Sequence, residues 1–155
     1  MHRAYLSLGT NVGDRYAHLS EGVRLVASDD AYRLSRVYET EPVGGVDQPS
    51  FWNLVMELTT DADAYELLDR AREAERARER TREVRWGPRT LDVDVLLVGD
   101  QVCSDPDIIV PHPRMHERRF VLVPLGELAP DLVDEATLGA AQGEVVALGT
   151  LDSLR

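Results

Sequence analysis

The sequence predicts an α+β fold: a ferredoxin-like βαββαβ antiparallel sheet with helices on one face and a C-terminal extension. Its first basis is a set of segments that are apolar or alternate in polarity as strands do, at residues 3–8, 32–40, 51–60 and 91–98. Its second basis is a pair of stretches with apolar side chains at helical spacing, one after Asp14 and one over residues 63–79. Their order is strand–helix–strand–strand–helix–strand.

The first half of the chain gives clear local reasons for its elements. Residues 9–14 form a turn, and Asp14 is a suitable N-cap for the helix that follows. That helix has apolar residues at helical spacing: Leu19, Val23, Val26 and Ala27. The two glycines of the turn do not complete a G-x-G-x-x-G dinucleotide fingerprint, so turn geometry explains them better. Residues 42–49 are rich in Pro and Gly, which predicts a loop.

The second half contains a helix over residues 63–79, with Asp63 as its expected cap. After the strand at 91–98, the Gly-Asp pair at 99–100 indicates a hairpin, with short strands expected near residues 101–103 and 108–110. Apolar residues at helical spacing return over 120–128. The acidic tail that follows offers no residues with evident chemistry.

Length and composition narrow the class of protein. The chain has 155 residues, which fits a single domain over 1–155 with a real hydrophobic core. No apolar run approaches the ~18 residues that span a bilayer, so we expect no membrane segment. Cys103 is the only cysteine, which excludes an internal disulfide and a CxxC motif. These features predict a cytoplasmic protein, and we expect a monomer.

The charge distribution is uneven. The net charge is 17 − 28 = −11, which argues against binding of nucleic acid or anionic membranes. Residues 70–89, however, hold eight arginines against four glutamates. A basic segment on an acidic protein indicates a small anionic ligand. Lysine is absent, which excludes a Walker-type P-loop.

The strand at 91–98 carries two carboxylates, Asp92 and Asp94. Side chains in a strand alternate between faces, so these two project the same way and repel each other unless a cation lies between them. A Mg²⁺ site is one interpretation, and a solvated edge strand is the alternative. The nearby Arg85 and Arg89 favour the first, because arginines beside a paired-carboxylate metal site indicate a polyphosphate ligand.

Two other polar positions allow more than one interpretation. Asn53 interrupts an apolar strand, either as a hydrogen-bonded structural amide or as a donor to a polar ring held against Phe51. His112 and His116 are four residues apart, but Pro113 argues against a helix there. With no further His or Cys nearby, we do not expect zinc.

Four segments together resemble one known family along nearly the whole chain. The most specific is RWGPRTLDVD at residues 85–94. The others are residues 5–15, residues 38–40 with 47–49 and Asn53, and residues 111–118. On these motifs the chain resembles the 6-hydroxymethyl-7,8-dihydropterin pyrophosphokinase (HPPK) family of folate biosynthesis. Arg78 and Glu79 depart from it, standing where many members have an apolar residue and a glycine.

The resemblance implies ATP as co-substrate, two Mg²⁺ ions per active site and a pterin alcohol that receives the β,γ-pyrophosphoryl group, with release of AMP. It implies metal binding by Asp92 and Asp94, with Arg80 and Arg89 as further catalytic residues. It implies ATP contacts from Glu75, Arg80, Arg82, Arg89, Val95, His112 and Arg118. It implies pterin contacts from Thr40, Val43, Phe51, Asn53, Trp86, Asp92 and Phe120, with the two phenylalanines stacking on the ring.

Further expectations concern motion and rival functions. The loops at 43–50 and 78–88 lack periodicity and carry site residues, so we expect them to be mobile without ligand and to close over ATP. One rival is a ferredoxin-like module that senses a small ligand. Another is a metal-dependent nucleotidyltransferase, which would release pyrophosphate and attach AMP.

Overall fold

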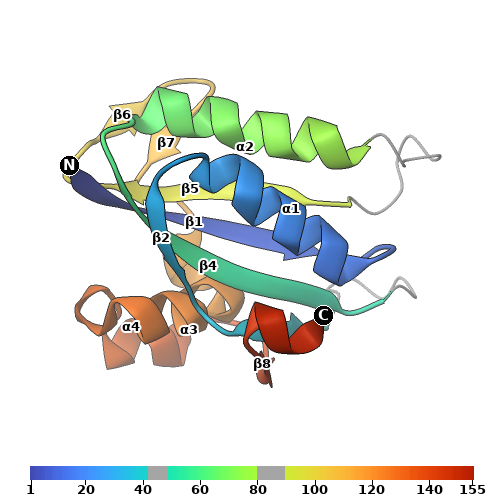
Figure 1. Ribbon diagram of the computed structural model, residues 1–155. Coiled ribbons are helices and arrows are strands. Elements are labelled where there is room, and N and C mark those ends of the chain that lie inside the picture. Colours follow the sequence, from blue (N-terminus) through green and yellow to red (C-terminus); the bar gives the residue numbers. More distant parts are fainter. Residues whose placement is uncertain (42–48, 80–89) are drawn as a thin grey trace.

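A computed structural model describes residues 1–41, 49–79 and 90–155, and within these ranges the chain forms a sheet between two layers of helices (Figure 1). The βαββαβ core consists of β1 (His2–Thr10), α1 (Arg15–Ala27), β2 (Ala31–Leu34), β3 (Val37–Thr40), β4 (Phe51–Thr60), α2 (Ala64–Glu79) and β5 (Asp92–Val98). The extension adds β6 (Cys103–Ser104), β7 (Ile109–Val110), α3 (Arg119–Leu128), α4 (Glu135–Ala140) and β8 (Val145–Gly149), with short 3₁₀ turns between them.

The described strands pair in an antiparallel sheet of six strands, in the order β5-β1-β4-β3-β8, with β2 also paired to β4. Helices α1 and α2 lie on one face, as the sequence predicts for the core (Figure 1). Helix α3 of the extension packs on the opposite face. The predicted α+β class is therefore confirmed, and the extension supplies the second helical layer.

Each face of the sheet has its own cluster of buried apolar side chains. The larger cluster, beneath α1 and α2, includes Leu6, Leu8, Leu54, Met56, Leu58, Val93 and Val95. The smaller cluster, beneath α3, consists of Tyr5, Val55, Leu96, Met115, Val121 and Leu125. Neighbouring residues on β1 and β4 go to opposite clusters, because strand side chains alternate between faces. Only part of the second face is covered in this way.

Both predicted helix caps are present. The Asp14 carboxylate accepts a hydrogen bond from Ala17 N (3.0 Å), and the Asp63 carboxylate accepts one from Glu66 N (2.9 Å). Each satisfies an amide that the first helical turn leaves without a partner. Among the helices described, none combines the length and the apolar character needed to cross a bilayer.

The prediction of one strand over residues 32–40 is wrong, because a β-bulge divides it. Leu34 pairs with Met56 and Tyr38 pairs with Asn53, so residues 35–37 face only residues 54–55. Ser35 stabilises the bulge through two hydrogen bonds to Val55. Its amide donates to Val55 O (2.9 Å), and its hydroxyl accepts from Val55 N (2.9 Å). A serine hydroxyl thus replaces a main-chain acceptor at the bulge.

The chain after β5 also differs from expectation. Gly99 makes a turn with a φ of 53°, but the short strands pair with each other in a separate ladder. The acidic tail contributes β8, whose Val145 and Ala147 pair with Thr40 and Tyr38. The tail therefore completes the sheet beside β3.

Candidate active site

The uncovered part of the second face brings together side chains from separate strands. In the register of the sheet, Asp92 lies opposite Gly9, Gly9 lies opposite Asn53, and Asn53 lies opposite Tyr38. Asp94 occupies the next same-face position on β5. Because Gly9 has no side chain, the amide of Asn53 on β4 can lie against the backbone of β1, beside the carboxylate on β5. The sheet thus forms the floor of a site between its two halves.

Asp92 and Asp94 share this face, as the sequence predicts. They alternate with Val93 and Val95, which are buried in the larger core, while Asp92 is half-buried and Asp94 is exposed. The strand β5 is also the edge of the sheet, as the alternative interpretation held. Across the described ranges, no group of three or more His, Cys, Asp or Glu side chains gathers as a metal site would. The pair still suits a hard cation, because its donors are all carboxylate oxygens on an open surface.

Asn53 is a buried and paired amide, with 5% of its surface exposed. Its Nδ2 donates to the hydroxyl of Thr40 (3.0 Å), which joins two residues of the implied pterin pocket. A Cβ at position 9 would overlap the Oδ1 atom of Asn53. The pairing confirms the structural interpretation of this amide, but an Asn has two donor hydrogens and an acceptor oxygen, so it retains capacity for a ligand.

Phe51 and Phe120 come from two different elements, β4 and α3. Phe51 pairs with Thr40 at the edge of the β3–β4 ladder and shares its face with Asn53 by strand alternation. Phe120 lies in the first turn of α3 and packs against the smaller core. Both are half-buried, so each ring has an exposed part that could contact a flat ligand.

His112 and Arg118 lie on the segment that leads from β7 to α3. His112 N donates to Leu96 O (2.9 Å), which holds the segment against β5. The His112 Nδ1 atom accepts from Arg114 N (3.2 Å), so we assign the proton of the neutral ring to Nε2. Burial, and then Arg118, lowers the pKa of His112, while Asp94 acts in the opposite direction. A neutral imidazole donor therefore lies within the electrostatic reach of Asp94 and Arg118.

Two residues that the resemblance assigned to ATP have contacts within the protein. The Glu75 carboxylate accepts from Val93 N (3.0 Å), so it ties α2 to β5 between the two aspartates. Val95 is buried in the larger core, which leaves only its main chain available to a ligand. The remaining predicted positions lie outside the described residues: Val43, Arg80, Arg82, Arg85, Trp86 and Arg89. The expected loop closure concerns residues 43–50 and 78–88, most of which lie outside the described residues. Arg78 and Glu79 belong to α2, so the expectation that the second loop begins at residue 78 is wrong.

Sequence reasoning missed contacts that fix β5 from the helical layer formed by α1 and α2. Arg78 Nε donates to His18 Nδ1 (2.8 Å), and the Thr90 hydroxyl donates to Arg78 O (3.0 Å). These bonds join α1, the end of α2 and the start of β5. A single indication existed in the sequence: His18 is a polar residue among the apolar positions of α1, where it needs a partner.

Comparison with known protein families identifies this arrangement. The model of the family described as 7,8-dihydro-6-hydroxymethylpterin-pyrophosphokinase (HPPK) matches residues 5–130. The chain belongs to this family. The match includes every described site residue and ends just after α3, so β8 lies beyond it.

Relatives in bacteria support the HPPK assignment. A 2-amino-4-hydroxy-6-hydroxymethyldihydropteridine pyrophosphokinase of Bacillus subtilis is 44% identical over 146 residues, which is 92% of this chain and 87% of that protein. The Pseudomonas aeruginosa protein of the same name is 42% identical, over 85% of this chain and 83% of that protein. The bifunctional protein FolKE of Lactococcus lactis subsp. cremoris is 40% identical over 83% of this chain, which spans 38% of that protein.

A solved structure shows the same fold. It is titled as a crystal structure of HPPK-DHPS in complex with substrates, and it superposes with a TM-score of 0.60 over 97% of this chain. The present chain corresponds to 42% of that one, and the two are 12% identical. At this identity the likeness concerns the fold alone.

Proposed function

We propose that this chain transfers the β,γ-pyrophosphoryl group of ATP to the hydroxymethyl group of 6-hydroxymethyl-7,8-dihydropterin, a step of tetrahydrofolate biosynthesis. The observation that carries the proposal is the row from Asp92 through Gly9 to Asn53, in a member of the HPPK family. The row begins at Asp92, which with Asp94 forms an anionic pair suited to cations, and it ends at an amide suited to a heterocycle. We also propose that the protein acts as a monomer in the cytoplasm.

The reaction needs neutralised charge and fixed geometry more than covalent catalysis. The hydroxymethyl oxygen of the pterin forms a bond to the β-phosphorus and releases its proton to water. The bond between that phosphorus and the α,β-bridging oxygen breaks, and AMP leaves with that oxygen. Asp92 and Asp94 would hold Mg²⁺, two ions by the family's pattern, and when bound Mg²⁺ supplies positive charge to the phosphate oxygens. His112 and Arg118 would donate hydrogen bonds to ATP.

The other half of the row would hold the pterin. Asn53 and Thr40 offer donors and acceptors at the floor, and the two half-buried rings of Phe51 and Phe120 offer apolar faces. No described side chain stands out as a general base for the hydroxymethyl group, so we propose that none is needed. The proposed site also includes residues that are assigned only from the sequence motifs: Val43, Arg80, Arg82, Trp86 and Arg89.

A product assay tests the reaction against its rivals. The protein is mixed with Mg²⁺, ATP and the pterin alcohol, and the products are separated. AMP together with a pyrophosphorylated pterin is expected. Free pyrophosphate would instead indicate nucleotidyl transfer, and unchanged ATP would favour a ligand-sensing module. Either of these outcomes would overturn the proposal.

The role of Asp94 gives the first prediction. Asp94→Ala removes one carboxylate of the pair, and we expect turnover to fall by roughly 10²–10³-fold or more, as for other lost electrostatic contacts in active sites. Asp100→Ala is the matched control, because Asp100 is an exposed aspartate in the turn after β5. It should keep the wild-type rate. A near-normal rate in Asp94→Ala would exclude Asp94 as a metal ligand.

A further inference from the structure

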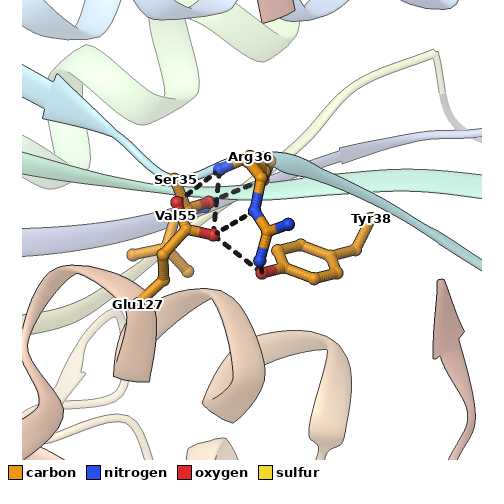
Figure 2. A network of polar contacts seen from close by, with 5 residues as sticks. All are labelled: Ser35, Arg36, Tyr38, Val55 and Glu127. Carbon is orange, nitrogen blue, oxygen red and sulfur yellow. Dashed lines mark hydrogen bonds and ion pairs between the residues drawn. The ribbon is translucent and has the colours of Figure 1, made fainter. Parts of the chain in front are cut away.

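The β-bulge between β2 and β3 creates an opening for a contact from the opposite layer. At the bulge the amide of Arg36 turns away from β4 and donates to the Glu127 carboxylate, at 3.0 Å from Oε2 and 3.2 Å from Oε1 (Figure 2). Glu127 lies near the C-terminal end of α3. A helix of the extension therefore satisfies an amide that the ladder leaves unpaired.

The same carboxylate collects further donors from the start of β3. Glu127 Oε1 accepts from Arg36 Nε (3.2 Å) and from the hydroxyl of Tyr38 (2.7 Å). Arg36 Nη2 in turn donates to the Tyr38 hydroxyl (3.2 Å), which closes a ring of contacts (Figure 2). Burial, and then the bond to Glu127, raises the pKa of Tyr38, so its hydroxyl keeps its proton and remains a donor. One glutamate thus fixes the first residues of β3 against α3.

The two elements joined here carry opposite sides of the proposed pterin pocket. On β3, Tyr38 lies opposite Asn53, and Thr40, two residues further on, is on the same face. On α3, Phe120 precedes Glu127 by seven residues, close to two full turns. Both side chains therefore project from the same side of the helix, toward the sheet. Fixing Glu127 on β3 sets where Phe120 lies relative to Thr40 and Asn53.

We propose that Glu127 and Tyr38 are positioning residues for the pterin half of the site, which set the spacing between Phe120 on α3 and Thr40 on β3. This inference rests on the proposed function. It assigns no chemistry to either residue, because the Tyr38 hydroxyl and the Glu127 carboxylate are bonded to each other and to Arg36. Their loss should weaken pterin binding while ATP binding, which depends on β5 and residues 112–118, changes little.

The chain offers a matched control for a tyrosine hydroxyl bonded to a glutamate. Tyr5 donates to Glu57 (2.8 Å) on the same sheet face, also beneath α3, and its exposed fraction of 5% matches the 4% of Tyr38. Glu57 is bound to Arg33 of β2, which also donates to Leu128 O at the end of α3 (3.2 Å), so this second network links α3 to β2 and not to β3. Tyr5→Phe and Tyr38→Phe therefore remove the same group at the same depth, and only the second removes a bond between β3 and α3.

The experiment measures the KM for each substrate and the thermal midpoint of both variants and of the wild type. For Tyr38→Phe we expect the KM for the pterin to rise by about five- to tenfold, the worth of one hydrogen bond, while the KM for ATP stays within about twofold. Tyr5→Phe should lower the thermal midpoint by about as much as Tyr38→Phe does, and it should leave both KM values unchanged. Glu127→Ala should raise the KM for the pterin more than Tyr38→Phe does. Glu127→Gln keeps an acceptor oxygen, so it should raise this KM less than Glu127→Ala does.

Two results would overturn the proposal. One is a pterin KM that changes equally in both tyrosine variants, or that changes in neither variant. The two hydroxyls would then affect only the stability of the protein. The other is an equal rise of both KM values in Tyr38→Phe. Direct titration of the wild type with the pterin, in the presence of a non-hydrolysable ATP analogue, separates this failure from failure of the proposed function. A wild type that binds no pterin refutes the function, whereas a wild type and a Tyr38→Phe variant that bind equally refute only the positioning role.

Discussion

The amide of Asn53 and the bare backbone of Gly9 share the space at the centre of the site. Asn53 is oriented by its bond to Thr40, and its oxygen then lies where a side chain at position 9 would project. Gly9 is in a regular strand without a positive φ, so its backbone conformation does not require glycine. The requirement is steric, because any Cβ there would displace the Asn53 amide.

Gly9→Ala tests this close approach. The added methyl group must push Asn53 aside, and we expect a loss of about 1–3 kcal/mol in the free energy of unfolding, as for overpacking in a core. Weaker pterin binding should accompany it. Denaturant unfolding and pterin titration measure the two effects. Gly139→Ala is the control, because a Cβ on Gly139 of α4 meets nothing within 4 Å.

The same substitution in an Asn53→Ala background isolates the cause. With the amide absent, the methyl group at position 9 has room, so Gly9→Ala should cost much less stability there. An equal cost in both backgrounds would show that the effect comes from the strand and not from Asn53.

At the scale of elements, the end of α2 is held from two sides. Arg78 donates to His18 of α1, and the Arg78 carbonyl accepts from Thr90, just before β5. One turn earlier, Glu75 accepts from Val93 N. The strand with the two aspartates is therefore fixed at its start by a helix that is itself fixed by α1. Arg78 thus has a structural partner in His18.

The bond to His18 predicts a dependence of stability on pH. Burial, and then Arg78, lowers the pKa of His18 from its usual 6.5, while Asp14 and a bond to the backbone of Val12 act in the opposite direction. The unfolded chain therefore binds a proton at His18 in a pH range where the folded chain does not. As the pH falls through 6.5 toward the lowered value, the free energy of unfolding decreases.

His18→Gln keeps an acceptor for Arg78 and cannot titrate in this range. We expect the difference in unfolding free energy between wild type and His18→Gln to shrink as the pH falls from about 7.5 to about 5.5. Denaturant unfolding at several pH values measures this difference, in which the titration of the other groups cancels. A difference that stays constant with pH would mean that His18 does not change its protonation on folding.

At the scale of the whole molecule, the acidic tail belongs to the folded unit. Its strand β8 pairs with β3, and Leu151 behind it is buried in the larger core beneath α1 and α2. Gln142 also binds the start of α3, accepting from Arg119 N (3.1 Å) and donating to Glu117 O (3.0 Å). The tail thus contacts both layers of the protein.

Leu151→Ala should therefore destabilise the entire chain. We expect a loss of about 2–4 kcal/mol, in a single cooperative transition, because the substitution leaves a cavity in the shared core. Val146→Ala is the control, since Val146 is 62% exposed on β8, and it should change stability by less than about 0.5 kcal/mol. An early, separate transition in Leu151→Ala would show instead that the tail unfolds on its own.

The sequence determined most elements of the βαββαβ core and the chemical character of the site. Helix caps at Asp14 and Asp63, the apolar periodicity of the helices and the alternation around Asp92 and Asp94 are local features, and each is visible in a short window of residues. The motifs around them were specific enough to indicate the HPPK family, which the family match and the relatives confirm.

Only the tertiary structure decided how these elements meet. The bulge at Ser35, the addition of β8 and the placement of α3 on the second face all depend on contacts between residues far apart in the chain. No local pattern specifies such contacts. The amide of Arg36, for example, finds its acceptor in Glu127, which is 91 residues further along the chain. The register that aligns Asp92, Gly9 and Asn53 is likewise a property of three strands together, and it alone turns separate motifs into one site.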